Sequence, residues 1–137
     1  MNVVDASVWV SLFVGSDAHH FESRRWFEEG VGRGATVVAP AIVLAEIAGA
    51  VARRTGRCSD GDAAVRLATR VPGIRLVNVN RHVGIHAASL ASELRLRGAD
   101  AIYVAVADLL EVPLVTWDDE QIGRAGIRVT AVRPTVD

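Results

Sequence analysis

Short apolar segments alternate with segments of helical pattern along this chain of 137 residues. The predicted strands cover residues 3–4, 36–39, 74–79, 113–116 and 127–132. Strands that alternate with helices favour a doubly wound parallel sheet, because the intervening helices then cover its two faces. We therefore expect one α/β domain over residues 1–137, with a central parallel sheet of four to five strands and helices on both faces.

Helical sequence fills the intervals between these strands, and cap and stop residues indicate where helices begin and end. Ser7 is placed to cap the first helix, and Pro40 to begin the third. Residues 100–110 are apolar nearly all round, so this helix should be central and covered. The other expected helices are residues 21–29, broken by Gly30, Gly32 and Gly34; 40–55, closed by Gly56; a segment from Ser59 or Asp60 that ends before Pro72; and 83–97, ended by Gly98.

The composition argues against several classes of protein. The formal net charge is −1, which is not the footprint of a strongly basic nucleic-acid binder. All 15 basic residues are arginine, and the lack of lysine disfavours aspartyl-phosphate signalling domains and haloacid-dehalogenase-like phosphatases. One cysteine, short apolar runs and no basic leader together predict a cytoplasmic protein without a membrane segment.

Four acidic residues occupy positions where a carboxylate is either structural or functional. Asp5 and Asp118 directly follow the first and fourth predicted strands, and Asp100 begins the most apolar helix. Each can be a helix cap or a helix-start acid that the dipole favours. Glu46 lies in the middle of the 40–55 helix among apolar neighbours, with no arginine at pairing distance on that face. It either reaches water through a roll of the helix or belongs to a site.

Ligands of parallel α/β sheets bind beyond the carboxyl ends of the strands, where these four acids can meet. Four carboxylates without a counter-charge would repel one another, and a hard divalent cation relieves that repulsion. Mg²⁺ and Mn²⁺ prefer oxygen ligands and keep several waters. The pattern therefore predicts Mg²⁺ or Mn²⁺ as cofactor. Asp5, Asp100 and Asp118 are the expected direct ligands, and Glu46 is expected to bind through water or to orient the nucleophile.

The sequence resembles the PIN domain, and within it the small ribonuclease toxins of the VapC type. The resemblance covers nearly the whole chain and rests on residues 3–7, Glu46, 97–103 and 114–118, of which 98–102 is the most specific part. It implies that the four acids match the quartet that binds Mg²⁺ or Mn²⁺ in the family.

Three further positions in the matching segments have expected roles. By the same resemblance, Ser7 and Thr116 match polar positions that support the site, whereas Trp117 lies where the family is variable.

The resemblance also implies an activity and partners. The expected activity is that of a metal-dependent endoribonuclease that hydrolyses RNA phosphodiester bonds. VapC-like proteins are usually homodimers held inactive by a VapB-type antitoxin. An alternative stays open: a PIN-like domain without nuclease activity that binds protein or RNA.

Arginines stand at two helix ends near the predicted site. Arg53 and Arg54 end the third expected helix, and Arg95 and Arg97 come just before the most apolar one. Basic residues at a helix end can simply complement the dipole. They can equally hold RNA phosphates beside a metal. Both interpretations stay open, and the four arginines are candidates for RNA binding.

Overall fold

One sheet of five parallel strands forms the centre of the molecule. The computed structural model describes all of residues 1–137. The strands are β1 (Asn2–Val4), β2 (Val37–Pro40), β3 (Ile74–Val77), β4 (Leu114–Val115) and β5 (Ala131–Val132). They pair in the order β3-β2-β1-β4-β5, with every pair parallel. The predicted parallel α/β fold is confirmed.

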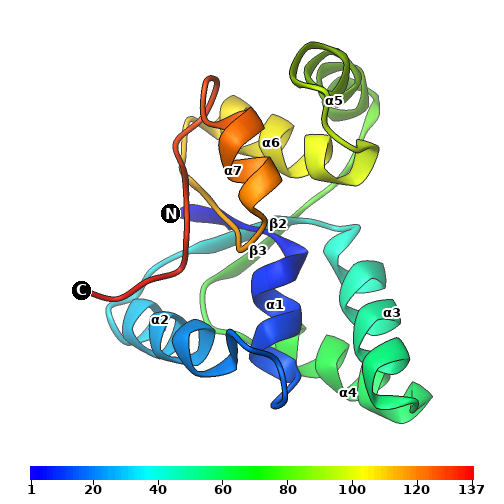
Figure 1. Cartoon of the computed structure of the whole chain (residues 1–137), viewed down its shortest axis with the longest axis vertical. Coiled ribbons are helices and arrows are strands. Elements are labelled where there is room, and N and C mark those ends of the chain that lie inside the picture. The colour runs from blue at the N-terminus through cyan, green and yellow to red at the C-terminus, as the bar shows by residue number, and fades with distance from the viewer.

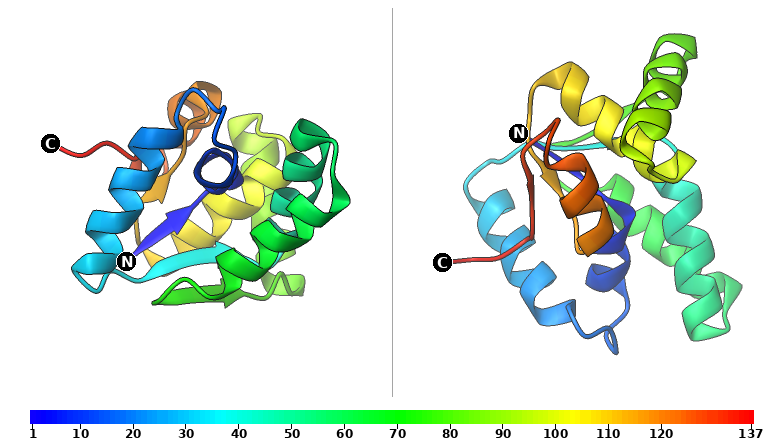
Figure 2. Two further views of the ribbon diagram at one scale, coloured as in Figure 1. Left: turned by 90° about the horizontal axis from the view of Figure 1, so that it is seen from below. Right: turned by 45° about the horizontal axis from the view of Figure 1, so that its top comes forward.

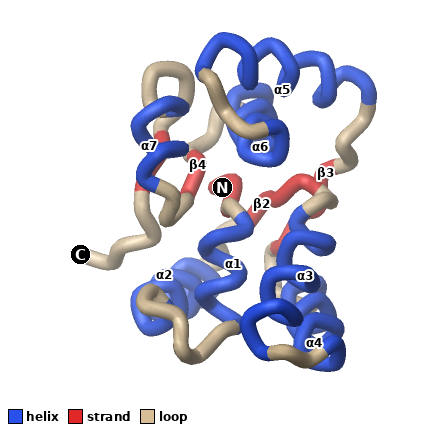
Figure 3. The backbone as a smooth tube through the Cα atoms, turned by 45° about the vertical axis from the view of Figure 1, so that its right-hand side comes forward, coloured by secondary structure: helices blue, strands red, loops and turns tan.

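Helices cover both faces of this sheet, as expected (Figure 1). Figure 3 shows the sheet edge-on, with α5 and α6 above it and α1, α2, α3 and α4 below. In the left view of Figure 2, α1 is seen end-on between α2 and the pair α3–α4. None of the helices is long and apolar enough to span a membrane. Their bounds are α1 (Ala6–Phe13), α2 (His20–Gly32), α3 (Val43–Thr55), α4 (Cys58–Thr69), α5 (Arg81–Leu94), α6 (Gly98–Leu110) and α7 (Asp119–Ala125).

The core lies where α6 packs on the middle strands. Val3 and Val4 of β1 have no exposed surface, and α6 contacts β1, β2 and β4. Five consecutive residues of α6, Tyr103 to Ala107, are buried. The prediction that the most apolar helix is central is confirmed, because a helix that is apolar on most sides must find cover on most sides.

The winding of the chain reverses between β1 and β4. The chain passes outward from β1 to β2 and β3, and then returns over the other face through α5 and α6 to place β4 beside β1. Val3 pairs with Leu114 and Val4 with Val115. At such a switch point the connections leave in opposite directions, which opens a crevice at the carboxyl ends of the two strands.

Several predicted element ends are wrong. Ser7 does not cap α1, because Asp5 does. Pro40 is the last residue of β2, opposite Val77 of β3, rather than the start of a helix. Gly30 lies within α2, which continues to Gly32.

The end of α5 is displaced most. This helix stops at Leu94, where Arg95 adopts a left-handed conformation with φ of 56°, and Gly98 begins α6 instead of ending α5. A left-handed arginine is unfavourable in isolation, so its sequence carries no stop signal.

The packing of α4 on α3 generates a test of the fold. A Cβ added at Gly61 would lie 2.6 Å from the carbonyl oxygen of Ala48, which is backbone and cannot move aside cheaply. Gly61→Ala should therefore lower the free energy of unfolding by roughly 1–3 kcal/mol, as overpacking does. Urea denaturation would measure this.

Gly84 is the matched control, because it also lies inside a helix but has nothing within 4 Å of an added Cβ. Gly84→Ala should raise the free energy of unfolding by about 0.5–1 kcal/mol through helix propensity alone. A Gly61→Ala protein as stable as the Gly84→Ala protein would contradict the close approach of α3 and α4.

Candidate active site

Asp5 and Thr116 meet at the switch point because β1 and β4 pair in register. The N–H of Asp5 donates to the carbonyl oxygen of Val115 at 2.9 Å, so the residue after each strand faces the other. Thr116 Oγ1 donates to Asp5 Oδ2 at 3.1 Å, and the N–H of Ser7 donates to the same oxygen at 3.0 Å. Asp5 is therefore both the N-cap of α1 and part of the site, and it uses only Oδ2 for the cap.

The hydroxyls of Ser7 and Thr116 join the two strand ends. Thr116 is fully buried, and its single hydroxyl hydrogen goes to Asp5, so Ser7 must be the donor in the 3.3 Å contact between the two hydroxyls. Ser7 Oγ in turn accepts from the N–H of Trp117 at 3.1 Å, and Thr116 Oγ1 accepts from the N–H of Asp118 at 3.1 Å. The hydroxyls of Ser7 and Thr116 thus each donate one hydrogen bond and accept at least one, and this network fixes the direction of the Asp5 carboxylate.

Asp118 repeats the arrangement seen at Asp5. Its Oδ1 accepts from the N–H groups of Glu120 and Gln121 at 2.9 and 3.3 Å, which caps α7. Oδ2 of Asp118 and Oδ1 of Asp5 accept no hydrogen bond from the protein. The cap and the site are therefore compatible roles for one carboxylate, because each uses a different oxygen.

Glu46 has a partner that sequence reasoning missed. The hydroxyl of Tyr103 donates to Glu46 Oε1 at 2.6 Å. Tyr103 is fully buried on α6, one turn after Asp100, and burial together with the Glu46 carboxylate raises the pKa of its hydroxyl. A buried tyrosine needs an acceptor for its hydroxyl, and that requirement was the available signal. Because α3 begins at Val43, Glu46 lies in its first turn rather than mid-helix.

Asp100 lies in the first turn of α6 and experiences the charge of all three other acids. Burial and then the charges of Asp5, Asp118 and Glu46 raise the pKa of Asp100 to about 6, and only Arg97 opposes them. The structure thus brings the four predicted carboxyl groups together, although they come from β1, α3, α6 and the end of β4. We refer to these four groups as the acidic cluster.

Burial also governs Asp5 and Glu46. It raises the pKa of Asp5, and the hydrogen bonds from Ser7 and Thr116 offset this only in part. Burial likewise raises the pKa of Glu46 against the stabilising hydrogen bond from Tyr103, and the charge of Asp5 adds to the rise. Concentrated negative charge that the fold leaves uncompensated suits a cation.

The acidic cluster fits a hydrated ion better than a closed cage of side chains. No group of three or more His, Cys, Asp or Glu side chains is arranged to hold a metal ion by itself. Mg²⁺ keeps several waters and is commonly bound through one or two carboxylates, so the unshared oxygens of Asp5 and Asp118 match its chemistry.

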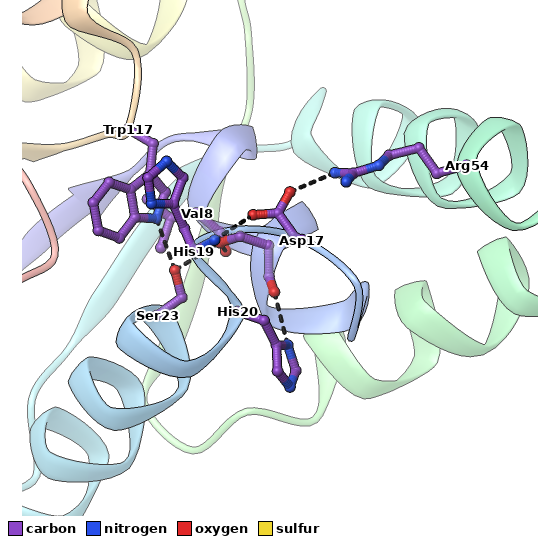
Figure 4. Close-up of polar contacts among 8 residues, drawn as sticks. Val8, Asp17, His19, His20, Ser23, Arg54 and Trp117 are labelled. Carbon is purple, nitrogen blue, oxygen red and sulfur yellow. Dashed lines mark hydrogen bonds and ion pairs between the residues drawn. The ribbon is translucent and has the colours of Figure 1, made fainter.

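A groove of about 650 Å³ includes Glu46 of the acidic cluster in its lining. Ser7 of α1 and Arg53 and Arg54 of α3 also line it. Arg54 pairs with Asp17 at 2.5 Å, as Figure 4 shows, whereas Arg53 has no acidic partner. The other two candidate arginines lie elsewhere: Arg97 acts on Asp100, and Arg95 forms the left-handed end of α5.

The raised pKa of Asp100 generates a prediction about stability. The folded protein holds this proton more tightly than the unfolded chain, whose carboxyl has a pKa near 3.8. The Asp100 contribution to the free energy of unfolding must therefore fall as pH rises from 3.8 to about 6 and stay low above that. Asp100→Asn should remove this fall. In EDTA, the free energy of unfolding of the variant should therefore rise relative to that of wild type between about pH 4 and about pH 7.

Urea denaturation at the two pH values would measure the gain, with Asp119→Asn as control because Asp119 is exposed and outside the acidic cluster. If Asp100 serves only as a helix-start acid, Asp100→Asn should instead be less stable than wild type at the higher pH.

Comparison with known proteins identifies the family. The model of the PIN domain matches residues 3–127. None of the curated proteins compared with the sequence matches it significantly. Similar solved structures include VapC20 from Mycobacterium tuberculosis, a Sarcin-Ricin loop cleaving toxin, with a TM-score of 0.75 and 23% identity over 90% of this chain and 94% of that chain.

Two further structures share the fold. FitAcB from Neisseria gonorrhoeae has a TM-score of 0.74 and 19% identity over 98% of each chain. A toxin-antitoxin complex from Klebsiella pneumoniae has a TM-score of 0.71 and 19% identity over 100% of each chain. These likenesses concern the fold, whereas the match of the family model spans most of the sequence: the chain belongs to the PIN domain family.

Proposed function

We propose that this protein is a metal-dependent endoribonuclease and the toxin of a VapBC-like toxin-antitoxin pair. The observation that carries the proposal is the acidic cluster at the switch point, where two aspartates each keep one oxygen unshared. Membership of the PIN domain family supports it, as does the likeness to a Sarcin-Ricin loop cleaving toxin and to toxin-antitoxin complexes.

In this proposal the carboxylates hold Mg²⁺ or Mn²⁺: Asp5 and Asp118 would provide direct ligands through their unshared oxygens, and Asp100, also expected from the sequence to be a ligand, would act through a bound water. A bound divalent ion would polarise the scissile phosphate and lower the pKa of a bound water. Glu46 orients the attacking water through Oε2, because Tyr103 occupies Oε1 and fixes the carboxylate plane. Ser7 and Thr116 keep Asp5 in position, and Arg53 contacts a phosphate of the RNA.

A VapB-like antitoxin and a second copy of the chain are the proposed protein partners. The support is that structures with the same fold include toxin-antitoxin complexes, one of them from Rickettsia felis bound to a promoter DNA fragment. Such an antitoxin would inhibit by covering the groove or by placing a cation among the carboxylates.

The central test is cleavage of RNA by the purified protein. Total RNA incubated with Mg²⁺ or Mn²⁺ should be cut, and EDTA should abolish the cutting. Asp118→Asn should lower the rate by roughly a hundredfold or more, since the metal contributes several kcal/mol to the transition state. Asparagine also caps helices, so this variant removes the charge and keeps the fold.

Asp119→Asn is the matched control, because this neighbouring carboxylate pairs with Arg133 and its side chain is 78% exposed. Its cleavage rate should stay near that of wild type. RNA cleavage that persists in EDTA would refute the metal mechanism, and RNA binding without cleavage would favour the alternative of a binding module.

Metal binding has a second readout that needs no substrate. Millimolar Mg²⁺ or Mn²⁺ should raise the melting temperature of wild type, because an ion that binds only the folded state stabilises it by mass action. Asp100→Asn should gain much less. Differential scanning calorimetry with and without EDTA would show this. If metal does not change the melting temperature of wild type, the three aspartates serve only at helix starts and Glu46 only as the hydrogen-bond partner of Tyr103.

A further inference from the structure

His19 and Trp117 form an aromatic stack beside the acidic cluster. Their ring centroids lie 3.9 Å apart with only 8° between the ring planes. His19 precedes α2, whereas Trp117 lies between Thr116 and Asp118 at the end of β4. His19 is exposed and Trp117 is half-buried, so the imidazole lies on the solvent side of the indole. Figure 4 shows the two rings overlapping face to face.

The Trp117 ring is anchored to the protein interior. Its Nε1 donates to Ser23 Oγ at 2.8 Å, and Ser23 and Ser11 lie 2.6 Å apart, both buried. Ser11 donates its hydroxyl hydrogen to the carbonyl oxygen of Val8 at 2.7 Å, so Ser23 must donate to Ser11. The bond between Trp117 and Ser23, drawn in Figure 4, ties the indole to this one-way chain of donors.

The backbone of His19 is held as well. Asp17 Oδ1 accepts from the N–H of His19 at 2.8 Å, and Asp17 Oδ2 accepts from Arg54 of α3 at 2.5 Å. The loop between α1 and α2 is thereby tied across the groove to α3. The stack is pre-organised by these contacts, so a ligand that uses it orders little of the protein on binding.

The stack lines the same groove as Glu46, one of the four residues of the acidic cluster. His19, Trp117, Arg53 and Arg54 line it together with Ser7 and Glu46. Its volume of about 650 Å³ lies within the range of small-ligand sites. The side chain of Arg53 runs back over Gly49 toward Glu46, since a Cβ at Gly49 would lie 3.1 Å from Arg53 Nη1. A free cation and a flat aromatic surface thus line the same groove as Glu46.

We propose that an unpaired base of single-stranded RNA stacks on the exposed face of His19, backed by Trp117, while Arg53 contacts the adjoining phosphate. The inference rests on the proposed function for the identity of the polymer. Proteins recognise single-stranded RNA by stacking splayed bases on aromatic side chains, histidine included. Stacking tolerates every base because each has a π-face, so this platform positions the strand without selecting its sequence.

Equilibrium binding of two probes tests the platform. One probe is a fluorescent oligoadenylate, and the other is a ribose-phosphate oligomer of the same length and label that lacks bases. Binding is measured by fluorescence anisotropy in a buffer that contains EDTA and little salt. EDTA prevents cleavage, and the low salt concentration strengthens phosphate contacts to both probes alike. Wild type should bind oligoadenylate about tenfold more tightly than the abasic oligomer. His19→Ala should bind the two nearly equally, and His19→Phe should restore the preference.

The design separates stacking from a structural role of His19. A displaced loop would change the affinity for both probes. Loss of stacking would weaken the binding of oligoadenylate alone, and so would change the ratio of the two affinities. Phe21→Ala is the matched control, since Phe21 is an aromatic residue two positions after His19, 76% exposed and outside the groove. It should keep the wild-type ratio.

Two outcomes overturn the inference: a wild type that binds both probes equally or not at all, and a His19→Ala protein that keeps the full preference for bases. Neither outcome bears on cleavage. RNA cleavage without a preference for bases would refute the platform and leave the nuclease in place. A base preference that depends on His19, in a protein that does not cleave RNA, would support the platform and refute the nuclease.

Discussion

The register between β1 and β4 is the constraint on which the site depends. Two strands of only three and two residues pair so that Asp5 faces Thr116, and the polar contacts of the cluster follow from that pairing. Both strands are buried, and α6 presses on them from one face. A shift of one residue would turn Asp5 away from the crevice and Val4 into it, so the apolar core and the acidic cluster enforce one another.

Concentrated charge is held in place by neutral neighbours rather than by cations. Hydroxyls from Thr116 and Tyr103 and the N–H groups at two helix starts take one oxygen of each of three carboxylates. This arrangement orients the groups and leaves their mutual repulsion in place. Arg97 is the one cation that opposes the raised pKa of Asp100. The fold therefore keeps the cluster electrostatically unsatisfied, which is the state that attracts a positive ligand.

The alternation of strands and helices predicted the sheet and its helical layers, and the apolar sequence of α6 predicted its central place. Both signals are local, because the hydrophobic pattern of a strand or helix can be read from its own residues. The four acids could be proposed from strand ends and an unpaired helical carboxylate. Contacts between distant segments could not be seen in the same way. Tyr103 was counted with an apolar segment, and its bond to Glu46 depends on how α6 lies against α3. Arg95 ended a helix without a glycine because tertiary contacts override a weak local preference.

The separation of β1 and β4 along the chain has a consequence for biosynthesis. Asp5 is made 111 residues before its partner Thr116. The pairing of β1 with β4 must wait until the intervening residues are made, and contacts of such long range slow folding. The nascent polypeptide thus carries an incomplete cluster until β4 and α7 emerge. A binding partner that recognises the assembled centre can therefore engage it only after β4 and α7 have been made.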